Sequence, residues 1–184
     1  MDASEAAIAT LQRYVDDYAQ DVNDVHSAVS DETQPLAARR LLVGALNYVL
    51  DVLDMLPDHY KGLGVADDAM VLRLAAAQAV AAGATDGGVK RLAADAAEIE
   101  AMFPSLASAF GRFVTAMPDR AVNNRTADRI LADRDTRVLF NADIARETAR
   151  HKTSTIELKF GGAAGVLKEL EKMLKHGLKR AGFE

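Results

Sequence analysis

The chain has 184 residues, a net charge of −5 and no cysteine, a size that fits one domain or one domain with an appendage. The lack of cysteine excludes disulfides, thiol nucleophiles and metal sites built on thiolates. The acidic segment Met1–Glu5 does not resemble a signal peptide, and no stretch reaches the ~18 apolar residues of a membrane span, so we expect a cytoplasmic protein.

Composition and charge indicate a helical body with a distinct C-terminal part. Hydrophobic residues make up 49% of the chain and aromatic residues only 5%, and alanine, the best helix former, is abundant. Residues 1–117 carry 8 basic and 17 acidic side chains, whereas residues 118–184 carry 14 and 10. We therefore predict a mainly α fold, with a helical bundle over 1–117 and a basic C-terminal extension over 118–184.

The first predicted helix is long and amphipathic. Its apolar residues alternate at spacings of three and four, the pattern of a buried helical seam. They are Ile8, Leu11, Val15, Tyr18, Val22, Val25 and Val29. Because Asp16, Asp17, Asp21 and Asp24 lie off this seam, we expect an acidic outer face.

The second and third predicted helices form a hairpin over about 41–83. Pro35 suits the first position of the second helix, and Pro57 is expected to stop it, because a residue before proline leaves the helical region. The third helix is expected from about Asp67 to Gly83, since glycine commonly follows a helix end.

The rest of the chain is predicted from weaker patterns. A seam over 89–113 continues through Pro104 and predicts one kinked helix, or two helices end to end. Residues 119–152 are dense in arginine and aspartate and predict one or two polar helices. Residues 155–160 alternate with period two, which predicts a short strand. A glycine-rich joint then leads to a helix over about 166–180.

This last helix separates leucine from lysine. Leu167, Leu170, Leu174 and Leu178 share one face, and Lys168, Lys172, Lys175 and Lys179 share another. Such a helix could lie on anionic lipid or on a partner, or it could pack on the acidic bundle of its own chain. Interfacial helices usually add Trp or Phe to the apolar face, and only Phe183 is nearby, which favours packing on the bundle.

The hairpin resembles the YkvA-like family of helical domains of unknown function. The family pattern is an apolar helix with a tyrosine, a Ser-Pro-x-Asp step, an apolar-Pro-Asp step, a glycine-containing loop and Asp-Asp at the start of the next helix. The matching residues are Tyr48, Asp54, Pro57, Asp58, Gly64, Asp67 and Asp68. Asp51-Val52 replaces the Ser-Pro pair. The resemblance implies a helical hairpin, often membrane-linked in relatives, and no agreed catalytic activity.

Aspartates gather at both ends of this hairpin turn. Asp51, Asp54 and Asp58 lie at a helix C-terminus, where the macrodipole disfavours negative charge, and Asp67 and Asp68 lie at a helix N-terminus, where it is favoured. Because a short turn joins the two helix ends, we expect these carboxylates to converge.

Two interpretations of the turn stay open. In the structural one, Asp54 and Asp58 accept hydrogen bonds from the amides that open the third helix and lock the hairpin. In the other, Asp54, Asp58, Asp67 and Asp68 hold Ca²⁺ or Mg²⁺, which take oxygen ligands. The spacing matches no EF-hand loop, and we favour the lock.

These patterns predict a non-enzymatic interaction or scaffold protein that binds a protein partner or itself. Peripheral membrane contact would involve residues 166–184. The alternative is a divalent-cation-dependent enzyme or sensor that uses the aspartate cluster. His59, beside Asp58, is the one histidine placed to act as an acid or base. Nucleic-acid binding is not expected, because aspartates interleave with the arginines of 119–137.

Overall fold

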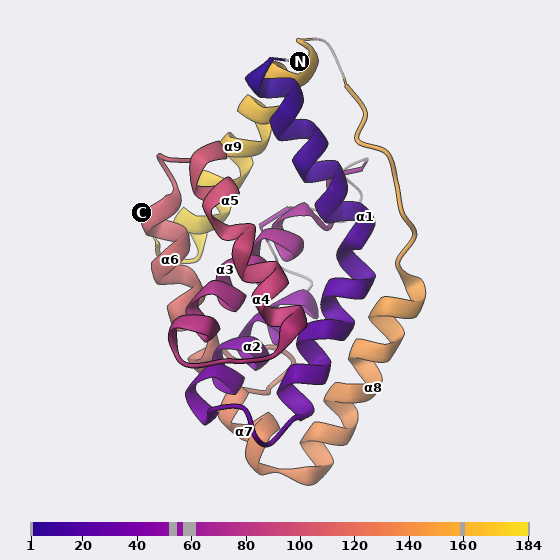
Figure 1. Ribbon diagram of the computed structural model, residues 1–184, viewed down its shortest axis with the longest axis vertical. Coiled ribbons are helices and arrows are strands. Elements are labelled where there is room, and N and C mark those ends of the chain that lie inside the picture. Colours follow the sequence, from indigo (N-terminus) through magenta and orange to yellow (C-terminus); the bar gives the residue numbers. More distant parts are fainter. Residues whose placement is uncertain (1, 52–54, 57–61, 159–160, 184) are drawn as a thin grey trace.

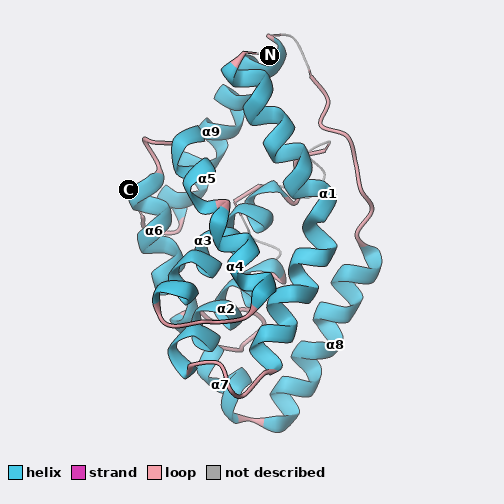
Figure 2. Cartoon of the chain, in the orientation of Figure 1, coloured by secondary structure: helices cyan, strands magenta, loops and turns pink. Residues whose placement is uncertain are grey.

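The computed structural model describes residues 2–51, 55–56, 62–158 and 161–183. Within these ranges the chain is mainly helical and contains no strand, which confirms the predicted fold class (Figures 1 and 2). The helices are α1 (Ala3–Ser30), α2 (Leu36–Val49), α3 (Ala66–Ala81), α4 (Gly87–Ala94), α5 (Ala96–Met102), α6 (Ala107–Ala116), the 3₁₀ turn η1 (Met117–Asp119), α7 (Ala127–Ala132), α8 (Arg134–Arg150) and α9 (Gly162–Arg180).

Helix α1 runs along most of the molecule and supplies one side of its core (Figure 1). Asp2 and Glu5 form a capping box, in which each side chain accepts a hydrogen bond from the other residue's amide. The predicted seam is buried from Leu11 to Val29. The predicted acidic outer face is wrong at Asp21, which is fully buried because Arg73 and Arg91 bind its carboxylate.

Helices α2 and α3 form the predicted hairpin, but α2 ends earlier than expected. The last helical residue is Val49, and the amide of Asp51 donates to the carbonyl of Tyr48 over 2.7 Å, which tightens the final turn. The chain therefore leaves the helix well before Pro57, a residue outside the described ranges. Helix α3 begins at Ala66, and Gly83 follows it with a φ of +96°.

The seam over 89–113 forms three helices instead of one kinked helix or two. The first break is at Asp95, whose carboxylate binds Arg13 of α1 and Arg73 of α3. The second lies between α5 and α6, where the amide of Leu106 donates to the carbonyl of Phe103 over 2.9 Å. The apolar spacing survives these breaks because the three helices turn the same face to the core.

The polar stretch 119–152 contains α7 and α8, as predicted, but the strand expected over 155–160 is absent from the described residues 153–158. That segment is extended and is held by a side chain instead of a second strand. The amide of Ile156 donates to Oε1 of Gln12 over 2.8 Å, and Nε2 of Gln12 donates to the carbonyl of Ser154. Helix α9 begins at Gly162, inside the predicted joint.

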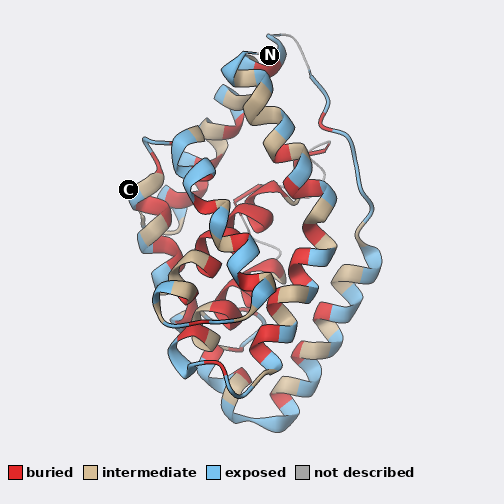
Figure 3. Cartoon of the chain, in the orientation of Figure 1, coloured by how far each residue is buried: buried red, intermediate tan, exposed pale blue. Residues whose placement is uncertain are grey.

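One continuous core joins both parts of the chain (Figure 3). Phe140 and Ile144 of α8 and Leu170, Leu174 and Leu178 of α9 lie in the same buried cluster as the apolar face of α1. The leucines of α9 therefore pack on the bundle of their own chain. Among the residues described, no helix combines the length and apolar character needed to cross a membrane.

Candidate functional site

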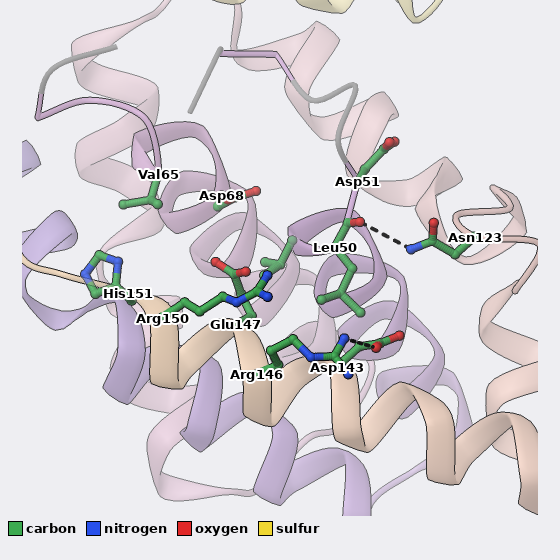
Figure 4. A pocket seen from close by; sticks show the side chains of 11 residues that line it. Leu50, Asp51, Val65, Asp68, Asn123, Asp143, Arg146, Glu147, Arg150 and His151 are labelled. Carbon is green, nitrogen blue, oxygen red and sulfur yellow. Dashed lines mark hydrogen bonds and ion pairs between the residues drawn. The ribbon is translucent and has the colours of Figure 1, made fainter. Parts of the chain in front are cut away.

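A pocket of about 670 Å³ lies where the ends of three helices meet, at the turn that the sequence singles out (Figure 4). The C-terminal end of α2, the N-terminal end of α3 and the last two turns of α8 form its walls. Its lining residues are Val49, Leu50, Asp51, Val65, Asp68, Asn123, Asp143, Arg146, Glu147, Arg150 and His151.

Beside this pocket, Asp67 holds the two arms of the hairpin together from inside the protein. The side chain is fully buried, and its Oδ2 accepts hydrogen bonds from Tyr48 Oη at 2.6 Å, from the Met55 amide at 3.0 Å and from the Leu56 amide at 3.2 Å. The Met55 amide also donates to Tyr48 Oη over 2.9 Å. The first turn of α3 is thereby bound to α2 and to the connecting chain.

The environment of Asp67 sets its protonation. Burial raises the pKa of its carboxyl to about 6, although the hydrogen bonds from Tyr48, Leu56 and Met55 act in the opposite direction. Burial likewise raises the pKa of Tyr48 well above its ordinary value, so the phenol stays a donor. Near neutral pH this lock is therefore built on a carboxylate that would bind a proton on mild acidification.

Asp68 lines the pocket, whereas Asp67 does not. It is 4% exposed, and Tyr18 Oη donates to its Oδ2 over 3.4 Å. The Tyr18 ring lies 4.8 Å from the ring of His151, which also lines the pocket. Burial, and then the charge of Asp68, raise the pKa of Tyr18 well above its ordinary value.

The structure places two of the four predicted site residues, Asp67 and Asp68, at the buried start of α3. Asp54 and Asp58 lie outside the described residues, as does His59. The structure describes a different lock, in which the Asp67 carboxylate of α3 accepts from amides of the preceding chain, and the predicted lock by Asp54 and Asp58 stays a prediction. Among the described residues, no three His, Asp or Glu side chains are grouped as metal ligands.

The wall formed by α8 carries most of the pocket's positive charge. Asp143 on this wall is bound by Arg125 at 2.8 Å and by Arg146 at 3.0 Å. Arg125 is only 7% exposed, and its Nε and Nη2 atoms are buried with no hydrogen-bond partner among the described residues. The Arg150 side chain is exposed and forms no hydrogen bond or ion pair with any part of the chain that the structure describes.

A second polar cluster, which sequence reasoning missed, lies deeper in the bundle and is centred on Arg73. This side chain is fully buried, binds Asp21 at 2.8 Å and Asp95 at 3.1 Å, and donates to the carbonyl of Ala69. Its guanidinium lies 3.7 Å from the centre of the Tyr14 ring. In the sequence Arg73 is a single arginine within an apolar run. That isolated charge was the one sign of a buried polar cluster.

The outer face of α9 forms a third feature. The side chains of Lys168, Lys172 and Lys175 are exposed, and none of them pairs with another described residue. Two hollows lie along this helix and share Lys175 and Lys179. The larger, of about 550 Å³, includes Met55 and Met173, and the smaller, of about 300 Å³, includes Leu106, Ala109, Leu178 and Phe183.

Comparisons with known proteins identify no relative of this chain. No family model matches the chain, and no match was found among curated proteins or solved structures. The YkvA-like resemblance of the hairpin stays a prediction.

Proposed function

We propose that this protein is a non-enzymatic interaction protein that binds an acidic, amphipathic protein segment on the outer face of α9. The observation that carries this proposal is that the apolar and basic side chains of α9 lie on different faces of the helix. Leu170, Leu174 and Leu178 are buried in the core, whereas Lys168, Lys172 and Lys175 face outward.

The lysines of α9 do not serve the packing of the helix on its own bundle. Opposite charges on bundle and extension could explain the basic helix if ion pairs joined them, but the described side chains of Lys168, Lys172 and Lys175 make none. The buried leucines and a hydrogen bond from Ser105 to Glu171 hold α9 on the bundle without these lysines. A basic face beside two partly apolar hollows suits a partner that presents carboxylates next to apolar side chains.

An anionic membrane is the less favoured partner. A helix that binds a bilayer surface inserts apolar side chains below the headgroups, whereas the leucines of α9 are occupied in the core. The apolar atoms beside Lys175 lie recessed in hollows, where a partner's side chain could enter. Lysines near an anionic surface still contribute about 1 kcal/mol each, so vesicles belong in the test.

The test is a binding titration of the whole chain with a synthetic amphipathic helix that carries leucines flanked by glutamates. Removing α9 is unsuitable, because its leucines complete the core. Lys172→Glu combined with Lys175→Glu should weaken binding, whereas Lys90→Glu on the exposed surface of α4 should not. Binding should also weaken as salt shortens the Debye length from about 8 Å at 0.15 M to about 3 Å at 1 M.

Three outcomes would count against the proposal. If a peptide with lysines in place of its glutamates bound as tightly as the glutamate peptide, charge complementarity could not explain the binding. Flotation with phosphatidylglycerol vesicles without any peptide binding would point to a membrane instead. Sedimentation that shows self-association sensitive to Lys172→Glu would identify a second copy of the chain, with its acidic body, as the partner.

A further inference from the structure

Helix α8 lies at the edge of the molecule and leaves one of its faces uncovered (Figures 1 and 3). It packs on α1 and α7 through a buried face that includes Phe140 and Ile144. The opposite face carries Val138 and Leu139, which are 59% and 63% exposed. Among the described residues, only two other large apolar side chains are more than half exposed, and neither lies on α8.

The exposed apolar residues of this helix form a continuous strip, here called the α8 strip. It consists of Val138, Leu139, Ala142 and Ala145, all exposed, and at about 100° per residue they fall within about 60° of Ala142 around the helix. The alanines let a second helix approach closely, because interaxial distance depends on the side chains at the contact. Single exposed apolar residues are common, whereas a contiguous apolar patch indicates an interaction surface.

We propose that the α8 strip is the contact surface of a homodimer, in which the α8 helices of two copies pack antiparallel across a twofold axis. The charges at the two ends of the strip favour a second copy as the partner. Asp135 lies at one end and Arg150 at the other, about 22 Å apart along the helix axis, and neither has a partner among the described residues. Antiparallel pairing of this helix with itself places each Asp135 beside the Arg150 of the other copy.

The same register suits the apolar residues between the two charges. Its midpoint falls next to Ala142, so the two helices come closest at a small side chain. Leu139 of one copy then lies opposite Arg146 of the other, and the aliphatic stem of an arginine covers apolar surface well. Val138 falls beside Ala145 of the other copy. The strip is therefore complementary to itself in shape as well as in charge.

The remaining charged residues of α8 do not oppose this contact. Arg134 lies about 160° around the helix from Arg150, on the other side of the strip. Asp143 and Glu147 are half-buried and line the pocket beside α2 and α3. Arg137 is also half-buried and donates to a carbonyl of α7. The contact uses no residue of α9, so it is independent of the interaction proposed for that helix.

Sedimentation equilibrium of the whole chain, from about 1 to about 500 μM, tests for the dimer. A contact between two single helices is smaller than the roughly 1,200–2,000 Å² of a stable interface, so we expect a Kd of about 10–100 μM. Leu139→Glu should raise this Kd at least about tenfold, because it removes apolar contact from both copies. Leu36→Glu is the matched control, since Leu36 is 62% exposed at the start of α2, and it should leave the Kd unchanged.

Exchanging the two charges tests the antiparallel register. Asp135→Arg alone and Arg150→Asp alone should each raise the Kd by about tenfold, since each places like charges beside one another at both ends of the strip. An equimolar mixture of these two variants should dimerise with about the Kd of the unmodified protein, because a mixed dimer has opposite charges at both ends.

Four results would overturn the proposal. They are a monomer at every concentration, an equal effect of Leu36→Glu and Leu139→Glu, failure of the mixed variants to dimerise, and self-association that Lys172→Glu abolishes but Leu139→Glu does not. The last of these would assign the contact to α9. Thermal unfolding at low concentration checks that each variant is folded, and Leu139→Ser replaces Leu139→Glu if the glutamate variant melts early.

Discussion

Tyr48 and Asp67 lie 2.6 Å apart, Oη to Oδ2, and together they bind the amide of Met55. This arrangement closes the α2–α3 hairpin with one carboxylate oxygen that accepts three hydrogen bonds. Two of these donors, the Tyr48 hydroxyl and the Leu56 amide, would otherwise be buried without an acceptor, so the oxygen at position 67 matters more than the charge it carries.

Replacing Asp67 should therefore separate the role of the oxygen from that of the charge. Asp67→Ala removes the acceptor for Tyr48 and Leu56 and one of the two acceptors of Met55, and we expect the free energy of unfolding to fall by roughly 2–4 kcal/mol. Asp67→Asn keeps an oxygen in place and should change it by less than about 1 kcal/mol. Urea unfolding monitored by circular dichroism measures both values, and equal losses would contradict the lock.

The same residue makes a prediction about pH. Burial raises the pKa of Asp67 to about 6 in the folded protein, above its ordinary value of 3.8. Between about pH 4 and pH 6 the folded state therefore holds more protons than the unfolded state, and stability falls as pH rises through that window. The contribution is at most about 3 kcal/mol.

Asp67→Asn cannot titrate and serves as the reference for this effect. The difference in the free energy of unfolding between the two proteins should change between pH 4 and pH 6 and stay constant from pH 6.5 upward. Asp21, whose pKa burial also raises, is present in both proteins and cancels in the difference. A difference that does not vary with pH would show that Asp67 stays ionised throughout.

The buried pair of Arg73 and Asp21 leads to a third prediction. Arg73→Met leaves a carboxylate in the core with only Arg91 beside it, and the free energy of unfolding should drop by about 3–5 kcal/mol. Adding Asp21→Leu should recover most of this loss, since Arg91 is partly exposed and keeps its bond to Asp24. Additive losses in this double-mutant cycle would mean that the two residues do not interact.

Two glycines in helices give a matched test of close packing. A Cβ at Gly44 would lie 2.8 Å from the backbone nitrogen of Pro118, whereas nothing lies within 4 Å of a Cβ at Gly111. Gly111→Ala should raise stability by about 0.5–1 kcal/mol, because alanine suits a helix better. Gly44→Ala should lower it, since the backbone of η1 has to move, and thermal unfolding compares the two.

The cation interpretation of the aspartate cluster can be tested separately. Donors already surround Oδ2 of Asp67, and we therefore expect Ca²⁺, Mg²⁺ and Mn²⁺ to leave the melting temperature unchanged. A ligand that binds only the folded state at 100 times its Kd would stabilise it by about 2.7 kcal/mol, which a melting curve readily detects. A rise that Asp68→Asn abolishes would establish the site as a cation site.

Local pattern was enough to predict the helices but not the contacts among them. The seam of α1 and the leucine face of α9 follow from residue spacing, because each face is buried as a unit. Spacing placed Asp21 on the outer face, since nothing local shows that Arg73, 52 positions later, meets it in the core. Such pairing is a property of the tertiary arrangement.

The candidate site shows the same limit. The convergence of two helix ends follows from the short turn, and Asp51 and Asp68 do line one pocket. The contribution of Arg146 and Arg150 was not foreseen, because α8 reaches the turn from a distant part of the chain. The lock at Asp67 was also unforeseen, since it depends on the Met55 and Leu56 amides that follow the early end of α2.

The contact between α1 and α9 bears on how the chain is made. Helix α1 shares its core with α9, which is synthesised much later, so part of the apolar surface of α1 stays uncovered until Leu178 has been added. A chain that is still being synthesised, or that ends before α9, presents that surface to chaperones and proteases.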